Sequence, residues 1–139
     1  MDSVAAQVEV WVEVPRGGLL KRDHLGHIDY VSPMPSPFNY GSVPGVIAED
    51  GAPQDVILLG PRLPRGHRGR WPVLGVVRFV DGGLCDDKLV CGKGVLTPGR
   101  RLALATFFRV YARFKRLLNR ARGIGGETTF GGVEARSAR

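Results

Sequence analysis

The chain has 139 residues, of which 43% are hydrophobic and 24% are charged, so it has room for one core and predicts a single domain over 1–139. No run approaches the roughly 18 to 20 uninterrupted apolar residues of a membrane helix. The N-terminus also lacks the basic-then-apolar order of a secretory signal. We therefore expect a cytoplasmic protein without membrane contact, whose two cysteines, Cys85 and Cys91, are reduced.

The net charge of +7 is concentrated in the last part of the chain. Residues 1–99 carry ten Lys or Arg against eleven Asp or Glu, whereas residues 100–139 carry ten against two. A basic segment of this kind can bind nucleic acid or another polyanion. Solvated helix faces and chain ends produce the same count. Charge alone leaves both interpretations open.

The first part of the chain is rich in short strand patterns. Alternating apolar and polar residues over 8–14, stopped by Pro15, predict a half-buried strand. Shorter strands are expected at 19–23 and 27–31, and the prolines and glycines of 32–45 predict an ordered loop. Strands at these spacings suit a barrel or a sandwich. Further apolar runs predict strands at 46–48, 56–59, 71–80 and 88–91.

From about Thr97 the apolar residues change to helical spacing. Pro98 suits the first turn of a helix, and the pattern predicts one amphipathic helix over about 98–122. The glycine-rich tail 123–139 cannot continue that helix, although 128–130 fits a short strand. The apolar positions of the predicted helix are Leu104, Phe107, Phe108, Tyr111, Phe114 and Leu118.

Four aspartates fall in two turns, and each turn directly precedes a strand pattern. Asp50 and Asp55 lie in one turn, and Asp81 and Asp86 in the other. If one end of a barrel brought the two turns together, cations would be needed to offset the repulsion. Carboxylate oxygens favour Mg²⁺ or Mn²⁺ over zinc. For any single aspartate, capping of its own turn is the more ordinary explanation.

Taken in chain order, these segments resemble the family I soluble inorganic pyrophosphatases. The resemblance covers about residues 8–93 well and 104–132 loosely, as in a divergent and shortened member. The similar motifs are Glu-x-Pro at 13–15, Asn-Tyr-Gly at 39–41, the Asp-Gly-Asp-Pro-x-Asp-Val signature at 50–56, Asp-x4-Asp-x-Lys at 81–88 and Phe-Phe-x-x-Tyr at 107–111.

The resemblance implies a fold, an activity and a set of site residues. The fold is mainly β, or α+β: an OB-like five-stranded barrel over about 8–93, with one long C-terminal helix at its side. The activity is magnesium-dependent hydrolysis of pyrophosphate to two phosphates by a metal-activated water, with manganese as an alternative metal. The implied residues are Asp50, Asp55, Asp81 and Asp86 as metal ligands, Lys21, Tyr40, Lys88 and Tyr111 as substrate contacts, Asp55, Asp86 and Lys88 as catalytic residues, and Glu13 and Asp23 as their support.

Three positions lack a functional group of the family pattern, and Asp23 stands where the family has a Glu. Ala52 stands where the signature has its middle Asp, Tyr30 where the family has a phosphate-binding Arg, and Ala112 where it has a Lys. We therefore expect reduced hydrolysis. The alternative is a catalytically impaired module that binds polyanions or nucleic acid through residues 100–139. Assembly into a homo-oligomer is a further expectation, since members of the family commonly assemble.

Overall fold

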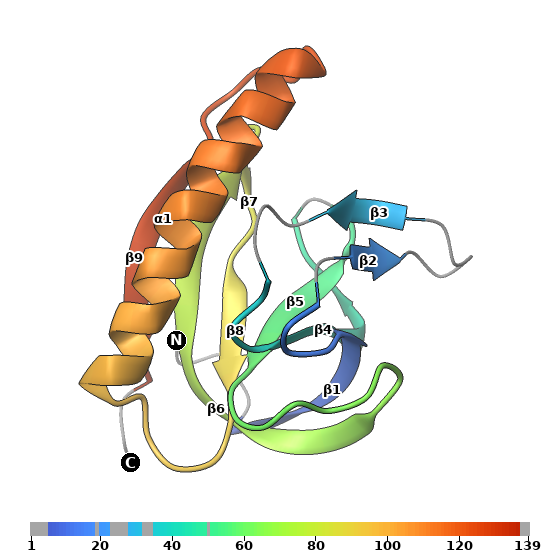
Figure 1. The fold of residues 1–139 in the computed structure, drawn as a ribbon, viewed down its shortest axis with the longest axis vertical. Coiled ribbons are helices and arrows are strands. Elements are labelled where there is room, and N and C mark those ends of the chain that lie inside the picture. The colour runs from blue at the N-terminus through green and yellow to red at the C-terminus, as the bar shows by residue number, and fades with distance from the viewer. Residues whose placement is uncertain (1–5, 19, 23–27, 32–34, 50, 137–139) are drawn as a thin grey trace.

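A closed barrel of five strands forms the body of the protein, and one long helix lies along its side (Figure 1). The computed structural model describes residues 6–18, 20–22, 28–31, 35–49 and 51–136, with the backbone alone at 20–22 and 28–31. The mainly β fold expected from the sequence is confirmed. Around the barrel the strands are β1 (Gln7–Val14), β4 (Asn39–Ile47), β5 (Pro53–Leu58), β8 (Lys88–Cys91) and β6 (Arg68–Asp81), which pairs again with β1.

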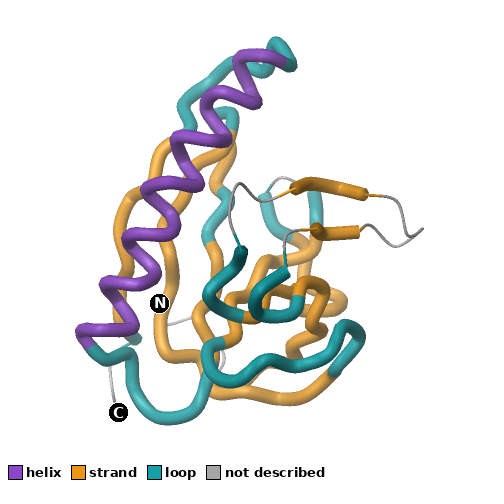
Figure 2. Tube along the Cα trace, in the orientation of Figure 1, coloured by secondary structure: helices purple, strands orange, loops and turns teal. Residues whose placement is uncertain are grey.

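The remaining elements extend this barrel on two sides. The short strand β7 and the C-terminal strand β9 both pair with β6, and α1 runs beside β9 (Figure 2). No helix within the described ranges has the length and apolar character needed to cross a membrane. The elements outside the five-stranded barrel are β2 (Leu20–Arg22) and β3 (Ile28–Val31), which pair with each other, β7 (Leu84–Cys85), α1 (Pro98–Ala121) and β9 (Thr129–Ala135).

The pairing of β5 with β8 is parallel, and it decides which side chains meet at one end of the barrel. Val56 lies opposite Leu89 in this pairing. Asp55 and Lys88 each precede one of these partners by one residue, so the register brings them side by side. Both β5 and β8 continue into buried apolar residues, which fixes the register because a slip by one residue would move every side chain to the opposite face.

The helix is attached to the barrel by an aromatic cluster. Phe108 stacks on Phe38 with a ring-centroid distance of 6.0 Å, and Tyr111 lies 5.6 Å from Phe79 of β6. Leu104 is fully buried between the same elements. Burial of each such side chain contributes about 1.5–3 kcal/mol, so the apolar face predicted from the helical spacing holds α1 in place.

The loop expected at 32–45 is wrong for residues 39–45, which belong to β4. Asn39–Val43 pair with β5 in regular register, and the ladder is interrupted between Val43 and Ile47. Pro44 and Gly45, whose φ is 79°, lie in this interruption. A proline is tolerated there because no ladder hydrogen bond is required of it. Pro44 and Gly45 belong to the prolines and glycines that made this part of the strand resemble a loop.

The short strand suggested at 128–130 is present and longer than expected, since β9 runs to Ala135. It passes through Gly131 and Gly132, and Gly132 has a φ of 111°. The register with β6 shifts between Arg78 and Phe79, next to these glycines. A glycine-containing bulge therefore allows a glycine-rich tail to form a strand.

Close approach of β1 and β4 predicts that Gly41→Ala destabilises the protein. A Cβ atom at Gly41 would overlap the carbonyl oxygen of Trp11, so the two strands would have to separate. We expect a loss of about 1–3 kcal/mol, as for other overpacked positions, measured by chemical denaturation. Gly99→Ala is the matched control, because no atom of the described residues lies within 4 Å of a Cβ there. Equal stability of the two variants would contradict this account of the barrel.

Candidate functional site

A buried ammonium group joins two of the predicted site carboxylates. Lys88 Nζ lies 2.8 Å from Asp55 Oδ2 and 2.7 Å from Asp86 Oδ2. The Lys88 side chain is 1% exposed, whereas those of Asp55 and Asp86 are 13% and 12% exposed. The three residues predicted to be catalytic therefore meet at the end of the barrel where β5 and β8 begin.

The electrostatics of this group favour a further cation. Burial raises the pKa of Asp86 to about 6, Lys88 opposes that rise, and Asp55 adds to it. For Lys88, burial acts to lower the pKa, but the two carboxylates outweigh it and raise the pKa above its ordinary value. Two carboxylates and one ammonium leave an excess of negative charge. Their oxygen atoms fit a hard divalent cation such as Mg²⁺.

Asp87 holds the segment that carries Asp86 and Lys88. Its Oδ2 lies 2.7 Å from Arg78 Nη1, and its Oδ1 accepts a 2.9 Å hydrogen bond from the backbone N of Phe79. Its carbonyl oxygen accepts a 2.6 Å hydrogen bond from Gln54 Nε2. Asp87 thus links β8 to both β6 and β5. This role could not be predicted from the sequence, because it depends on strand neighbours that are distant along the chain.

Glu49 connects the two acidic turns. Its Oε2 accepts a 3.0 Å hydrogen bond from the backbone N of Cys85, the residue before Asp86. This contact was also missed from the sequence. The two turns expected to meet at one end of the barrel are therefore joined by a side chain that is not itself part of the predicted ligand set.

Asp81 lies at the end of β6 and is held by the helix. Its Oδ1 accepts a 2.7 Å hydrogen bond from Asn119 Nδ2, and its Oδ2 lies 3.1 Å from Lys115 Nζ. Among the described residues, no three His, Cys, Asp or Glu side chains form one cluster that could hold a metal ion. The four-aspartate ligand set therefore stays a prediction, and its members Asp55 and Asp86 are the pair that meets at Lys88.

The predicted tyrosines lie in the aromatic cluster beside this group. Lys88 Nζ is 5.5 Å from the ring centroid of Phe79, which also contacts Tyr111. Tyr40 lies opposite Ile57 in β4–β5 pairing and is 7% exposed. The other predicted residues are Glu13, half-buried near the end of β1, Lys21, on β2 with only its backbone described, and Asp23 and Asp50, which lie outside the described residues.

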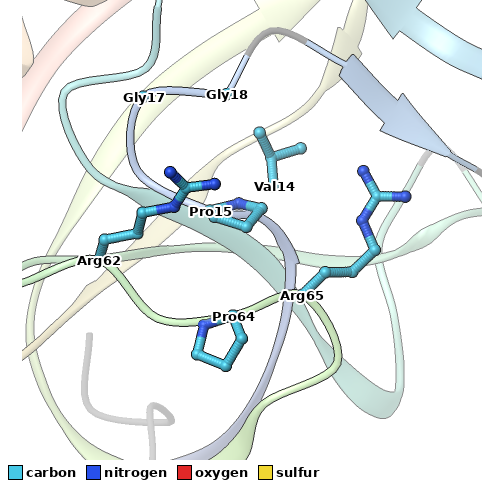
Figure 3. Close-up of a pocket in the computed structure, with 7 residues that line it drawn as sticks. All are labelled: Val14, Pro15, Gly17, Gly18, Arg62, Pro64 and Arg65. Atoms are coloured by element: carbon cyan, nitrogen blue, oxygen red, sulfur yellow. The ribbon is translucent and has the colours of Figure 1, made fainter.

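A pocket of about 830 Å³ lies at the end of β1, beyond Glu13. In Figure 3 the side chains of Arg62 and Arg65 extend on either side of Val14 and Pro15. Both arginines belong to the loop between β5 and β6. Its lining residues are Val14, Pro15, Gly17, Gly18, Arg62, Pro64 and Arg65.

Known proteins are similar to this chain over the residues that carry this group. The family model described as inorganic pyrophosphatase matches residues 10–97, which include Lys88 and its two acidic partners. An inorganic pyrophosphatase of Haemophilus influenzae is 36% identical over 98 residues, which are 65% of this chain and 56% of that protein. One from Neisseria meningitidis is 42% identical over 67 residues, covering 46% of this chain and 38% of that protein.

Solved structures show the same fold. A crystal structure of an inorganic pyrophosphatase from Neisseria gonorrhoeae aligns with a TM-score of 0.75 and 26% identity, covering 94% of this chain and 83% of that chain. The one from Thermus thermophilus aligns with a TM-score of 0.76 and 24% identity, covering 98% and 86%. The chain belongs to the inorganic pyrophosphatase family. In sequence it spans about half the length, or less, of the curated relatives above.

The raised pKa of Asp86 predicts a titration in the metal-free protein with a midpoint near pH 6. Because this pKa lies above the value of 3.8 for an ordinary Asp, the folded state binds more protons between these values. The contribution of Asp86 to the free energy of unfolding should therefore fall as the pH rises from about 4 to about 6. Carboxyl ¹³C NMR measures the midpoint, and Asp86→Asn should remove that signal. A midpoint below about 4.5 would contradict the described burial.

Proposed function

We propose that this protein is an inorganic diphosphatase that hydrolyses pyrophosphate to two phosphates with Mg²⁺. The observation that carries the proposal is the buried Lys88 ammonium between Asp55 and Asp86. Family membership supports it, since the matched residues contain all three side chains. The oxygen donor set supports magnesium, with manganese as the alternative.

Some of the site residues would bind the metal, and others would bind the substrate. Asp55 and Asp86 would hold magnesium, together with the predicted ligands Asp50 and Asp81. Magnesium bound there would supply a Lewis acid that brings the pKa of a water molecule toward about 7. Lys88 places a positive charge where phosphate oxygens would approach the carboxylates. Its burial strengthens that interaction, because a preorganised charge in a water-poor site is weakly screened.

The overall step is a displacement at one phosphorus atom. The water oxygen forms a bond to phosphorus as the bridging P–O bond breaks, and the bridging electron pair leaves with the second phosphate. The water proton passes to solvent or to a phosphate oxygen. Lys21, Tyr40 and Tyr111 are proposed to bind phosphate oxygens, with Glu13 and Asp23 in support, as the family pattern implies.

We propose a reduced rate for this chain because three positions lack the family's functional groups. Loss of a positioned base at Ala52 costs on the order of 10²- to 10⁴-fold, and loss of one cation about 10²- to 10³-fold. Such losses do not simply multiply. Ala112 is 2% exposed in the aromatic cluster, so its position is filled by packing.

The alternative of polyanion binding finds less support in the described contacts of the basic segment. Arg101 donates to the carbonyl oxygen of Val133, and Arg116 to that of Thr128. Arg109 lies over the ring of Phe130. Part of the basic charge therefore serves to attach α1 to the C-terminal strand. A cytoplasmic location and homo-oligomeric assembly remain proposals taken from the sequence and the family.

Hydrolysis of magnesium pyrophosphate is the direct test. The wild-type protein should release phosphate, and Asp86→Asn should lower the rate by about 10²-fold or more, because it removes a charge facing the reacting group. Glu9→Gln is the matched control, since Glu9 is an exposed acid on β1. Phosphate release measured by a colorimetric assay should be equal for wild type and the control. No release above the Asp86→Asn level would refute the proposed function.

Magnesium should also stabilise the folded protein. A ligand that binds only the folded state at 100 times its dissociation constant adds about 2.7 kcal/mol to the free energy of unfolding. We expect a stabilisation of this order from MgCl₂, reversed by EDTA and largely lost in Asp86→Asn, measured by urea denaturation. Potassium chloride of matched ionic strength is the control. An equal effect of both salts would show that magnesium has no specific site.

A further inference from the structure

Both oxygens of the Asp81 carboxylate contact side chains of one helix, α1. Asn119 Nδ2 donates to Oδ1 at 2.7 Å, and Lys115 Nζ lies 3.1 Å from Oδ2. Asn119 is 4% exposed, and the Lys115 side chain is 15% exposed. Both helix residues lie outside the residues matched by the family model, which end at 97. The contacts therefore belong to a part of the chain that the match does not describe.

The spacing of these residues explains why they reach Asp81 together. Lys115 follows Tyr111 by four residues, and Asn119 follows Lys115 by four, so all three lie along one face of α1. The first part of that face packs into the aromatic cluster at Tyr111, which contacts Phe79 of β6. Asp81 lies two residues after Phe79, at the end of the same strand. Apolar packing thus brings the polar end of this helix face to Asp81.

A second set of contacts holds the turn that begins at Asp81. Asn119 Nδ2 also lies 3.0 Å from Thr128 Oγ1, which accepts a 3.0 Å hydrogen bond from the backbone N of Gly82. The backbone N of Gly83 donates to the carbonyl oxygen of Glu127 at 2.8 Å. The turn is therefore tied to both the helix and the segment before β9. Asn119 is the side chain that joins these bonds to the carboxylate.

We propose that Asn119 and Lys115 set the magnesium affinity of the pyrophosphate site in opposite directions, through their contacts with the Asp81 carboxylate. Asn119 fixes the orientation of the carboxylate through Oδ1. Lys115 neutralises Oδ2 in the metal-free protein and competes there with a divalent cation. The inference rests on the proposed function, because it takes Asp81 as one of the magnesium ligands.

Calorimetric titration of the full chain with MgCl₂, without pyrophosphate, tests this inference. Asn119→Ala should weaken magnesium binding by about 10- to 100-fold, as expected for partners of metal ligands. Lys115→Met should strengthen binding several-fold, and Lys115→Arg should behave as wild type. Arg113→Met removes the same charge from an exposed position of α1 and should change nothing.

Each effect is then measured again in an Asp81→Asn background, as a double-mutant cycle. The inference predicts that the effects of Asn119→Ala and Lys115→Met disappear there, because the carboxylate through which they act is gone. Effects that persist, or single variants with wild-type affinity, would overturn it. So would a wild-type protein that binds no magnesium. If circular dichroism shows that Asn119→Ala does not fold, the variants of the partly exposed Lys115 provide the test.

Hydrolysis of pyrophosphate is assayed on the same variants, so that the two proposals can fail separately. Asn119→Ala should raise the magnesium concentration needed for half-maximal rate more than it lowers the rate at saturating magnesium. A merely structural role would lower the amount of folded protein without moving that concentration. If the variant effects on magnesium binding depend on Asp81 but the wild type does not hydrolyse pyrophosphate, only the proposed function is rejected. If the wild type hydrolyses pyrophosphate but the variant effects do not depend on Asp81, only the inference is rejected.

Discussion

The Lys88 ammonium is buried between two carboxylates, and the arrangement of the site depends on it. Removing one partner of a buried ion pair costs about 3–5 kcal/mol, because the other charge remains in the protein interior. Asp55 and Lys88 are placed by the parallel pairing of β5 and β8, whereas Asp86 comes from the turn before β8. The same charges that join these elements also leave an excess of negative charge, which a divalent cation would satisfy.

The rest of the protein keeps this group in place from two directions. On the barrel side, Asp87 ties the Asp86–Lys88 segment to β5 and β6. On the helix side, the aromatic cluster fixes α1 against β6, and the polar end of the helix reaches Asp81. Stability and site geometry therefore share the same contacts. A variant that loosens α1 is expected to act on the site before it unfolds the barrel.

Much of the fold could be predicted from the sequence, because its signals are local. The alternation of apolar and polar residues predicted β1, and apolar residues three and four apart predicted α1. The observed bounds of α1, Pro98–Ala121, lie close to those expected. Residues 39–45 of β4 were expected to be a loop, because the prolines and glycines of 32–45 are typical of one. Of the four aspartates that spacing singled out, Asp55 and Asp86 meet at Lys88. Asp87, Lys115 and Asn119 were not foreseen, because their partners are fixed only by the packing of distant elements.

A crystal structure of the protein with Mn²⁺ and imidodiphosphate, a pyrophosphate analogue that resists hydrolysis, would test the central claim most directly. Manganese can be located by its anomalous scattering. The account predicts an anomalous peak in contact with the carboxylates of Asp55 and Asp86, and a phosphate oxygen of the analogue within hydrogen-bond distance of Lys88 Nζ. Manganese bound only at other residues would contradict the account. So would an analogue bound at another surface while Lys88 still contacts only Asp55 and Asp86.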